Sequence, residues 1–398
     1  MAYAQPATKG KLHSITLLII AEVMAMSLWF VSAAILGDMS REANLTAGVQ
    51  AALSASVQLG FVVGALALSI TGIADRFPPK KVLALFALLA ALSNALLLVA
   101  APGSGFAILL RGATGAFLAG VYPVGMKIAV GWGQKDRGLL VGLLVGGLTL
   151  GSAAPHLLAF LGGTDWRLTV VCASILAACA AVIILRTEDG PFHSSQAKFD
   201  SRVLVAAWTN RDIRRAYGGY LGHMWELYAM WAWIAVALTI SFSHQMPESE
   251  AQQLAKLVTF IAIALGALSC PLAGWVADRT GKAELTIIAM AISGISAVVF
   301  ALSFGGSVWL TVAVVVVWGI FIIPDSAQFS ALVADYAQPD QVGSLLTFQT
   351  ALGFALTTVT VQLTPVVAAK IGWPWVMAAL ALGPLFGIYC MWKLRRKS

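Results

Sequence analysis

The stretch Gly274-Trp275-Val276-Ala277-Asp278-Arg279-Thr280-Gly281-Lys282 is a short charged segment between two long apolar runs. Its core, Ala277-Asp278-Arg279, recurs 203 residues earlier as Ala74-Asp75-Arg76. Half of the 398-residue chain is 199 residues, so this spacing indicates two similar halves. Glycines permit tight turns, and an aspartate suits the positive end of a helix dipole. We therefore expect the same charged loop at the same place in each half.

The composition is that of an integral membrane protein. The chain is 59% hydrophobic and 11% charged, with a mean hydropathy of +0.86. An average soluble domain is about 25% charged, and a soluble chain of this length could not bury so much apolar surface. The net charge of +7 is explained by membrane topology and predicts no nucleic-acid partner. All four cysteines fall in apolar runs, where they act as small packing residues.

The apolar runs have the length of membrane-spanning helices. A helix needs about 20 mostly apolar residues to cross the hydrocarbon. We expect an all-α membrane protein with twelve such helices in two pseudo-symmetric bundles of six. The twelve runs lie near 14–36, 49–71, 82–101, 105–129, 138–160, 168–186, 214–242, 253–276, 284–304, 307–328, 342–365 and 373–392.

The distribution of Lys and Arg predicts the orientation. With a cytoplasmic N-terminus, 20 of the 25 fall on the cytoplasmic side, four (Arg41, Arg167, Lys256 and Lys370) on the other side, and Arg111 inside the membrane. Both termini are then cytoplasmic, in a multi-pass protein of the plasma (inner) membrane. The predicted segments are a cytoplasmic N-terminus (1–13), an N-terminal bundle (14–186), a cytoplasmic linker (187–213), a C-terminal bundle (214–392) and a basic cytoplasmic tail (393–398).

Four charged residues lie inside predicted spans. Glu22, Arg111, Glu226 and Asp325 fall on the first, fourth, seventh and tenth helices. Charges within the membrane are costly and are functional candidates by default. We expect Asp325, which follows Pro324 about 18 residues into its helix, to lie near the cytoplasmic mouth and to act as a gate contact.

The seventh helix carries the leading candidate for proton coupling. His223 and Glu226 are three residues apart and share a helix face. Glu226 lies roughly 18 Å into the span, near the middle of the membrane, where loss of hydration favours a protonated carboxyl. It could therefore take up and release protons at cellular pH. The alternative is a permanently protonated, structural glutamic acid.

Arg111 and the aromatic residues of the seventh helix are candidates for cargo binding. Arg111 could hold an anionic group or pair with a carboxylate, and Glu22 is its expected counter-charge and a further coupling candidate. Tyr220, Trp225 and Met230 could line a cargo site, although aromatic side chains at helical spacing are more often packing residues.

The segment 274–282 resembles the signature loop of the major facilitator superfamily, a glycine, three residues, Asp, Arg or Lys, one residue, Gly, and Arg or Lys. The second copy fits at every fixed position, whereas the first has Thr71 and Pro78 in place of the glycines. The resemblance implies that the first, fourth, seventh and tenth helices line a central cavity. It also implies a conformational latch made by Asp75, Arg76, Gly274, Asp278, Arg279, Gly281 and Lys282.

Two further motifs resemble the superfamily. Arg111-Gly112-Ala113-Thr114-Gly115 is similar to its fourth-helix motif, an Arg followed four residues later by Gly. The fifth helix carries closely spaced glycines, which permit close helix approach, and then a proline. It partly resembles the superfamily's exporters, whose motif has Gly and Pro adjacent, whereas Gly151 and Pro155 are four apart here.

These observations predict a secondary active transporter that moves a small solute by alternating access. We expect proton coupling, a small organic anion or zwitterion as cargo, and a monomer in the lipid bilayer. One alternative is a proton-driven exporter of hydrophobic or drug-like compounds, and another is a non-transporting membrane sensor or scaffold. The sequence carries no nucleotide-binding, metal-binding or catalytic motif, so we expect neither an enzyme nor a cofactor. The second and eighth helices lack arginines, which disfavours nitrate or nitrite.

Overall fold

The structure is a computed structural model that describes residues 8–133, 136–188, 190–191, 203–338 and 341–395. Every regular element in these ranges is a helix. The elements are α1 (Thr8–Met26), α2 (Val31–Ala43), α3 (Ala47–Thr71), α4 (Ile73–Arg76), α5 (Pro79–Ala95), η1 (Leu96–Leu98), α6 (Gly105–Leu118), α7 (Tyr122–Trp132), α8 (Arg137–Leu161), α9 (Trp166–Ile184), α10 (Val203–Thr209), α11 (Arg211–Phe242), α12 (Glu248–Thr280), α13 (Lys282–Ser303), α14 (Val308–Phe321), α15 (Ser326–Tyr336), α16 (Val342–Ile371), α17 (Trp373–Ala379) and α18 (Leu382–Arg395).

Twelve helical stretches in the described ranges are long and apolar enough to cross a membrane, which confirms the predicted all-α fold. Several spans extend beyond their predicted ends. The first runs over Gly10–Ala43 and the tenth over Val308–Tyr336. Each of these two spans contains a break in its helix, so apolar length alone does not locate the ends of the regular helix.

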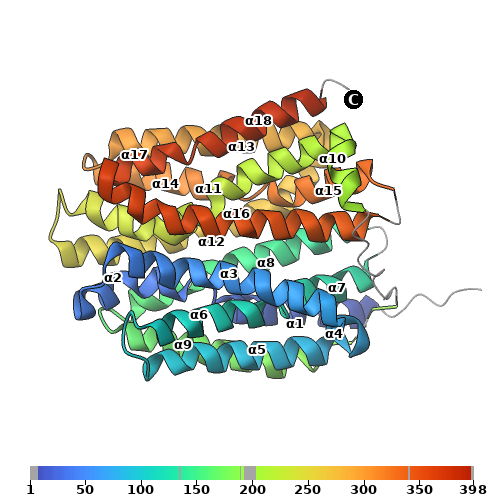
Figure 1. The fold of residues 1–398 in the computed structure, drawn as a ribbon, viewed down its shortest axis with the longest axis horizontal. Coiled ribbons are helices and arrows are strands. Elements are labelled where there is room, and N and C mark those ends of the chain that lie inside the picture. Colours follow the sequence, from blue (N-terminus) through green and yellow to red (C-terminus); the bar gives the residue numbers. More distant parts are fainter. Residues whose placement is uncertain (1–7, 134–135, 189, 192–202, 339–340, 396–398) are drawn as a thin grey trace, which may run out of the picture.

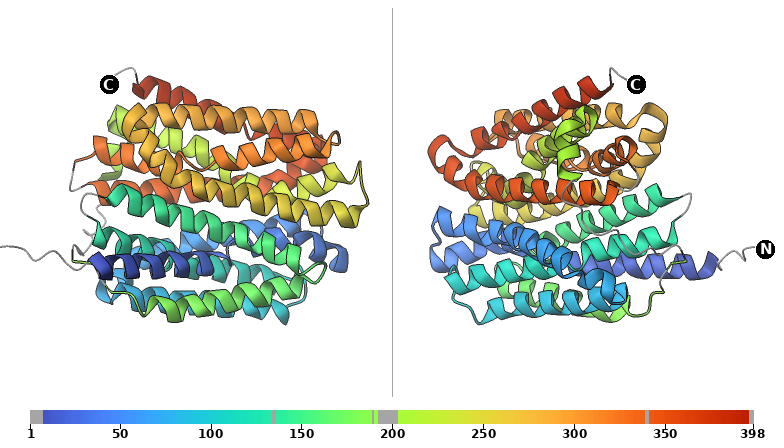
Figure 2. Two further views of the ribbon diagram at one scale, coloured as in Figure 1. Left: turned by 180° about the vertical axis from the view of Figure 1, so that it is seen from behind. Right: turned by 45° about the vertical axis from the view of Figure 1, so that its right-hand side comes forward.

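The two halves of the chain form two layers. Figure 1 shows α1 to α9 in the lower layer and α11 to α18 in the upper one, and both views in Figure 2 show the same separation. At the boundary α8 packs along α12, and α3 packs along α16. The start of α1 and the end of α18 lie at the same end of the bundle, on the right of Figure 1. We call this the terminal end and the other the opposite end.

The first, fourth and tenth spans are interrupted near their middles. The first breaks between α1 and α2, the fourth between α6 and α7, and the tenth between α14 and α15. Pro123 and Pro324 lie at the last two breaks. A proline has no backbone N–H and clashes with the preceding turn, which ends or kinks a helix. These two prolines are 201 residues apart, close to the 203-residue offset of the charged loops. Their breaks therefore follow the same twofold repeat of the sequence.

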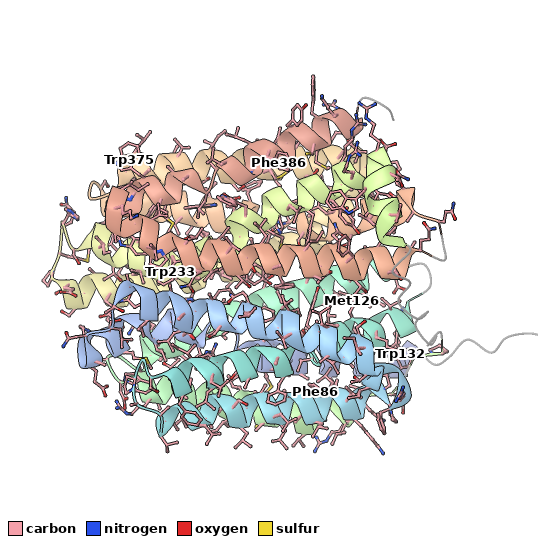
Figure 3. All side chains as sticks on the ribbon, in the orientation of Figure 1. Phe86, Met126, Trp132, Trp233, Trp375 and Phe386 are labelled. Atoms are coloured by element: carbon pink, nitrogen blue, oxygen red, sulfur yellow. The ribbon has the colours of Figure 1, made fainter. Side chains whose placement is uncertain are left out.

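The outer flanks of both layers carry large apolar side chains. Trp375 and Phe386, labelled in Figure 3, are 59% and 53% exposed. Such exposure would be unfavourable in water but suits contact with lipid, because a surface that faces lipid does not need polar side chains. This distribution leaves the boundary between the layers as the place where buried polar side chains can gather.

Candidate functional site

A buried contact between a histidine and an aspartate joins the seventh and tenth spans. His223 lies on α11, and Asp325 lies at the break between α14 and α15, just before α15 begins. The imidazole Nδ1 is 2.9 Å from the Asp325 carboxylate, and each side chain is 1% exposed. The prediction that Asp325 lies near the mouth of the tenth helix is therefore wrong. The span continues for 11 residues beyond it, to Tyr336, which places Asp325 inside the bundle.

Glu226 lies one helical turn from His223, and its carboxylate accepts hydrogen bonds from two neighbouring helices. One oxygen accepts a hydrogen bond from the Ser293 hydroxyl (2.9 Å), and the other accepts one from the Trp318 indole N–H (2.8 Å). Glu226 is 1% exposed. Its donors are neutral, so no cation is needed to hold this carboxyl in place. His223, Glu226 and Asp325 together form what we call the C-half cluster, which lies within the second half.

Glu22 is buried in the first half without a partner. It is fully inaccessible, and neither carboxylate oxygen has a hydrogen-bond partner among the described residues. The fourth and fifth spans approach it through glycines. A Cβ placed on Gly125 would come within 2.9 Å of Oε2, and one on Gly147 would lie 3.7 Å from Cγ. A carboxyl held between two glycines has space beside it only because these positions carry no side chain.

Arg111 does not pair with Glu22 in this structure. Its guanidinium donates to the carbonyl oxygens of Leu28 (2.9 Å) and Trp29 (2.8 Å). It also donates to the side-chain oxygens of Ser32 (2.6 Å) and Asn94 (2.8 Å). The break between α1 and α2 frees backbone carbonyls, and a buried carbonyl without a partner is costly. Arg111 satisfies them, which explains its full burial. The sequence around this break contains neither Gly nor Pro, so nothing in the sequence marks it.

The other candidates for cargo binding lie in different surroundings. Tyr220 is buried, and its ring centroid is 6.3 Å from that of His223, so it borders the C-half cluster. Trp225 instead packs against Gly383 in the last span, on another side of α11. Met230 is completely buried. Of these three residues, Tyr220 is the one with a ring contact to the cluster.

Aromatic side chains close the boundary between the halves near the break in the first span. Sequence reasoning missed this feature. The Trp29 ring lies 5.8 Å from Tyr228 and 5.5 Å from Phe354, and Phe61 lies 4.5 Å from Phe354. Phe30 and Trp231 extend the same cluster across the boundary at 5.7 Å. The sequence shows aromatic residues in these spans but not that they meet.

Buried polar atoms without partners gather on the spans at the boundary. Buried polar groups are normally hydrogen-bonded, so an excess of unpaired ones needs a reason. Faces that meet water or a polar ligand in another conformation would show such an excess. Besides Glu22, the described side chains concerned on these spans include Trp29, Ser54, Gln58, Ser152, His156, Trp231, Thr259 and Gln349.

The charged segment 274–282 is largely helical. Gly274 lies inside α12, and the turn is made at Gly281, whose φ is +98°. The expected turn at Gly274 and helix start at Asp278 are therefore wrong, because α12 continues to Thr280. Arg279 stacks on Trp275 with its guanidinium carbon 3.7 Å from the ring centroid. Lys282 pairs with Asp335 at 2.5 Å.

In the first copy of this segment, Gly72 supplies the left-handed turn with φ +64°. It stands one residue after Thr71, which occupies the position of the expected glycine. Arg76 ends the short helix α4. Asp75 lies in the same helix, and its side chain is outside the described part of the structure. The two copies thus share their place at the end of a span but differ in how the chain turns.

Comparison with known proteins agrees with this architecture. A family model described as the Major Facilitator Superfamily matches residues 17–324. No curated protein sequence matches. Among solved structures, a bacterial homologue of the human lysosomal transporter Spinster, inward-facing and occupied, has a TM-score of 0.76 at 14% identity and covers 98% of each chain.

Two other solved structures show the same fold. A point mutant of the nucleoside transporter NupG has a TM-score of 0.73 at 15% identity, covering 96% of this chain and 99% of its own. The xylose transporter XylE from E. coli, partially occluded and inward open, has a TM-score of 0.74 at 12% identity, with coverages of 96% and 99%. The chain belongs to the Major Facilitator Superfamily, and it is a multi-pass membrane protein and secondary transporter, not an enzyme.

Proposed function

We propose that this protein couples the movement of a small organic solute to protons by alternating access. The observation that carries the proposal is the C-half cluster, in which His223, Glu226 and Asp325 lie buried with neither Lys nor Arg among their described partners. Ionisable groups inside a membrane protein mark ion or proton pathways by default. These three groups come from two spans and can pass a proton among themselves. Because no lysine or arginine is among their described partners, no fixed positive charge is left behind when the proton leaves.

Each member has a distinct role in this proposal. Glu226 is the titrating carboxyl, because its neutral donors Ser293 and Trp318 can accommodate either protonation state. His223 and Asp325 form the adjacent relay, in which the imidazole Nδ1 lies 2.9 Å from the Asp325 carboxylate. Glu22 is the corresponding carboxyl of the first half. Its unpartnered oxygens could receive a proton or a donor group of the cargo.

The expected anionic or zwitterionic cargo depended on Arg111 as a free cation. A guanidinium carries five N–H groups, and Arg111 already makes four hydrogen bonds within the protein. A zwitterion remains compatible with a site in which Glu22 meets its positive end. The second candidate, an exporter of hydrophobic or cationic compounds, is favoured by this unpaired carboxyl and by the aromatic cluster around Trp29 and Tyr228. Tyr220 is the ring that we propose contacts cargo in either case.

The remaining assignments stay proposals of the same kind. The segments at Gly72–Arg76 and Gly274–Lys282 would latch the terminal end in one conformation, with the pair Lys282–Asp335 as the part that holds the second copy. The excess of Lys and Arg at the terminal end supports an orientation with both termini in the cytoplasm, and with it a plasma (inner) membrane location. We propose a monomer as the working unit.

The first experiment is a thermal-shift screen of the purified protein at two pH values. The panel contains organic anions, amino acids, sugars and lipophilic cations, and Glu22→Gln is run beside the wild type. Stabilisation by zwitterions or cations that Glu22→Gln removes would support the role of Glu22. Uptake of the stabilising compound by proteoliposomes with and without an imposed pH gradient then tests the coupling. Uptake that ignores the gradient would contradict proton coupling.

A further inference from the structure

A buried ion pair joins the two halves at the opposite end of the bundle. The Lys256 ammonium on α12 lies 2.7 Å from the Asp38 carboxylate on α2, and the two side chains are 3% and 2% exposed. Among the ion pairs between described residues, this is the one that crosses from one half to the other. The charge count assigns Lys256 to the non-cytoplasmic side, at the start of the predicted eighth span, and nothing in the sequence indicates its partner.

The ammonium also binds the end of the fifth span. Lys256 donates to the carbonyl oxygen of Gly163 (2.7 Å) and more weakly to that of Ala159 (3.3 Å). The Ala159 carbonyl belongs to the last turn of α8, which carries the negative end of the helix dipole, and Gly163 lies in the turn just after this helix. One ammonium therefore uses its three N–H groups on two separate elements of the first half.

Gln252, one turn before Lys256, completes the contact. Its amide donates to the second oxygen of Asp38 at 3.0 Å, so both carboxylate oxygens receive a bond from α12. The Gln252 side chain lies against Gly37 of α2, where an added Cβ would be 2.7 Å from its amide nitrogen. Arg41 also pairs with Asp38 from within α2, which leaves the carboxylate fully compensated.

Within the described ranges, the charged contacts between the halves lie at this one place. Among the described residues, each hydrogen bond across the boundary that involves a charged group comes from Gln252 or Lys256. Toward the terminal end, α8 and α12 meet through small residues and backbone. A Cβ on Gly146 would lie 3.0 Å from the carbonyl of Ala267. That surface can slide or part without exposing a charge.

We propose that Asp38, Gln252 and Lys256 form a polar lock that holds the two halves together at the opposite end, and that the halves part there only when this lock opens. A buried ion pair stabilises little overall when water can replace each partner, but removing Lys256 takes the buried cation away from Asp38 and leaves only the partly exposed Arg41 to balance its charge. The lock is thus strong while closed and can open without large cost, because opening hydrates both charges at once. This inference does not depend on the cargo or on proton coupling.

The test is hydrogen–deuterium exchange of the unlabelled full-length protein in lipid nanodiscs, comparing wild type with Lys256→Met. At the opposite end, the two halves are either parted or closed. We expect the ratio of the parted population to the closed population to rise at least about tenfold, as for the loss of a charge-assisted hydrogen bond. Exchange should rise in peptides from α2 and the start of α12. It should fall at the terminal end of α8 and α12, since alternating access closes one end when the other opens.

The matched control is Arg167→Met. Arg167 pairs with Glu42 at 2.6 Å, also at the opposite end, but both residues belong to the first half and are exposed. This variant should leave both ends unchanged. If Lys256→Met does not fold, Gln252→Ala keeps the Lys256–Asp38 pair and removes no charge, so it should give a smaller shift in the same directions.

Two results would overturn the lock. The first is hydrogen exchange in folded Lys256→Met or Gln252→Ala that rises at both ends or at neither end. A rise at both ends would mean that the protein is loosened generally, and a rise at neither end would mean that the lock has no role. The second is an equal response in Arg167→Met, which would mean that any charge removed at this end has the same effect.

Discussion

The Nδ1 atom of His223 lies 2.9 Å from the carboxylate of Asp325, with both side chains 1% exposed. The two residues are 102 positions apart in the sequence and meet because the tenth span breaks at Pro324, where α14 has ended and α15 has not begun. Glu226 is one turn away on the same helix as His223. A proton gained or lost by His223, Glu226 or Asp325 changes the net charge of the C-half cluster, which has neither lysine nor arginine among its described partners.

Replacing Asp325 by Asn tests the relay. The variant removes the counter-charge of His223 while keeping the size of the side chain. Removing one partner of a buried pair costs several kcal/mol, so we expect uptake driven by a pH gradient to fall at least about tenfold. The measurement is initial uptake in proteoliposomes at a fixed inward proton gradient. Asp165→Asn serves as the control, because Asp165 is an exposed N-cap of α9 at the opposite end and asparagine caps a helix as well as aspartate does. Equal loss in both variants would contradict a specific role of Asp325.

Replacing Glu226 by Gln separates coupling from transport. A glutamine amide can still accept from Trp318 and occupy the same space, but it cannot carry the proton. We expect accumulation against a gradient to be lost while exchange of labelled for unlabelled cargo persists. Counterflow and gradient-driven uptake are measured on the same vesicles. Glu284→Gln, a partly exposed carboxylate on α13 paired with Arg395, should keep both activities. Retained pH-driven accumulation in Glu226→Gln would rule out Glu226 as the titrating group.

The twelve spans could be predicted from sequence because hydrocarbon thickness imposes a minimum apolar length on every crossing helix. The repeat of Ala-Asp-Arg at 203 residues likewise indicates two similar halves. His223 and Glu226 could be assigned to one face from their spacing alone. Each of these inferences uses only local geometry or periodicity, which a single sequence contains.

Contacts between distant spans could not be predicted in the same way. Charge alone favours a pair between Arg111 and Glu22, yet Arg111 binds carbonyls freed by a helix break that no Gly or Pro marks. Distance along an unbroken helix misplaces Asp325, because α14 ends early. The sequence places Lys256 at the outer start of the eighth span, but it does not show that the ammonium pairs with Asp38 of the other half. Each of these contacts depends on the packing of spans that are distant in the sequence.

Replacing Arg111 by Lys should lower stability before it alters cargo recognition. A lysine ammonium has three N–H groups and no planar fork, so it cannot make all four bonds of Arg111. Each lost bond to a charged donor costs about 1.5–3 kcal/mol, and the freed carbonyls at the end of α1 would be left unpaired. We expect a clearly lower melting temperature, read by intrinsic fluorescence. Arg167→Lys, on the exposed pair with Glu42, should leave it nearly unchanged. A stable Arg111→Lys protein that no longer binds cargo would instead favour the cargo-anchor role.

Replacing Gly115 by Ala tests whether the second glycine of the Arg111–Gly115 motif is there for packing. Helix α3 crosses α6 so closely that a Cβ on Gly115 would lie 2.0 Å from the carbonyl oxygen of Val57. The obstacle is backbone, which cannot rotate away, so the two helices must separate. Overpacking of this kind costs about 1–3 kcal/mol or more.

We therefore expect Gly115→Ala to lower both the melting temperature and the yield of folded protein. Gly48→Ala on α3, where an added Cβ meets nothing within 4 Å, should leave both unchanged. Because Gly115 is one helical turn from Arg111, separated helices would also move the guanidinium away from Leu28 and Trp29. Combining Gly115→Ala with Arg111→Lys should then cost less than the sum of the two changes, since both weaken the same contact. Strict additivity of the two melting shifts would show that the residues act independently.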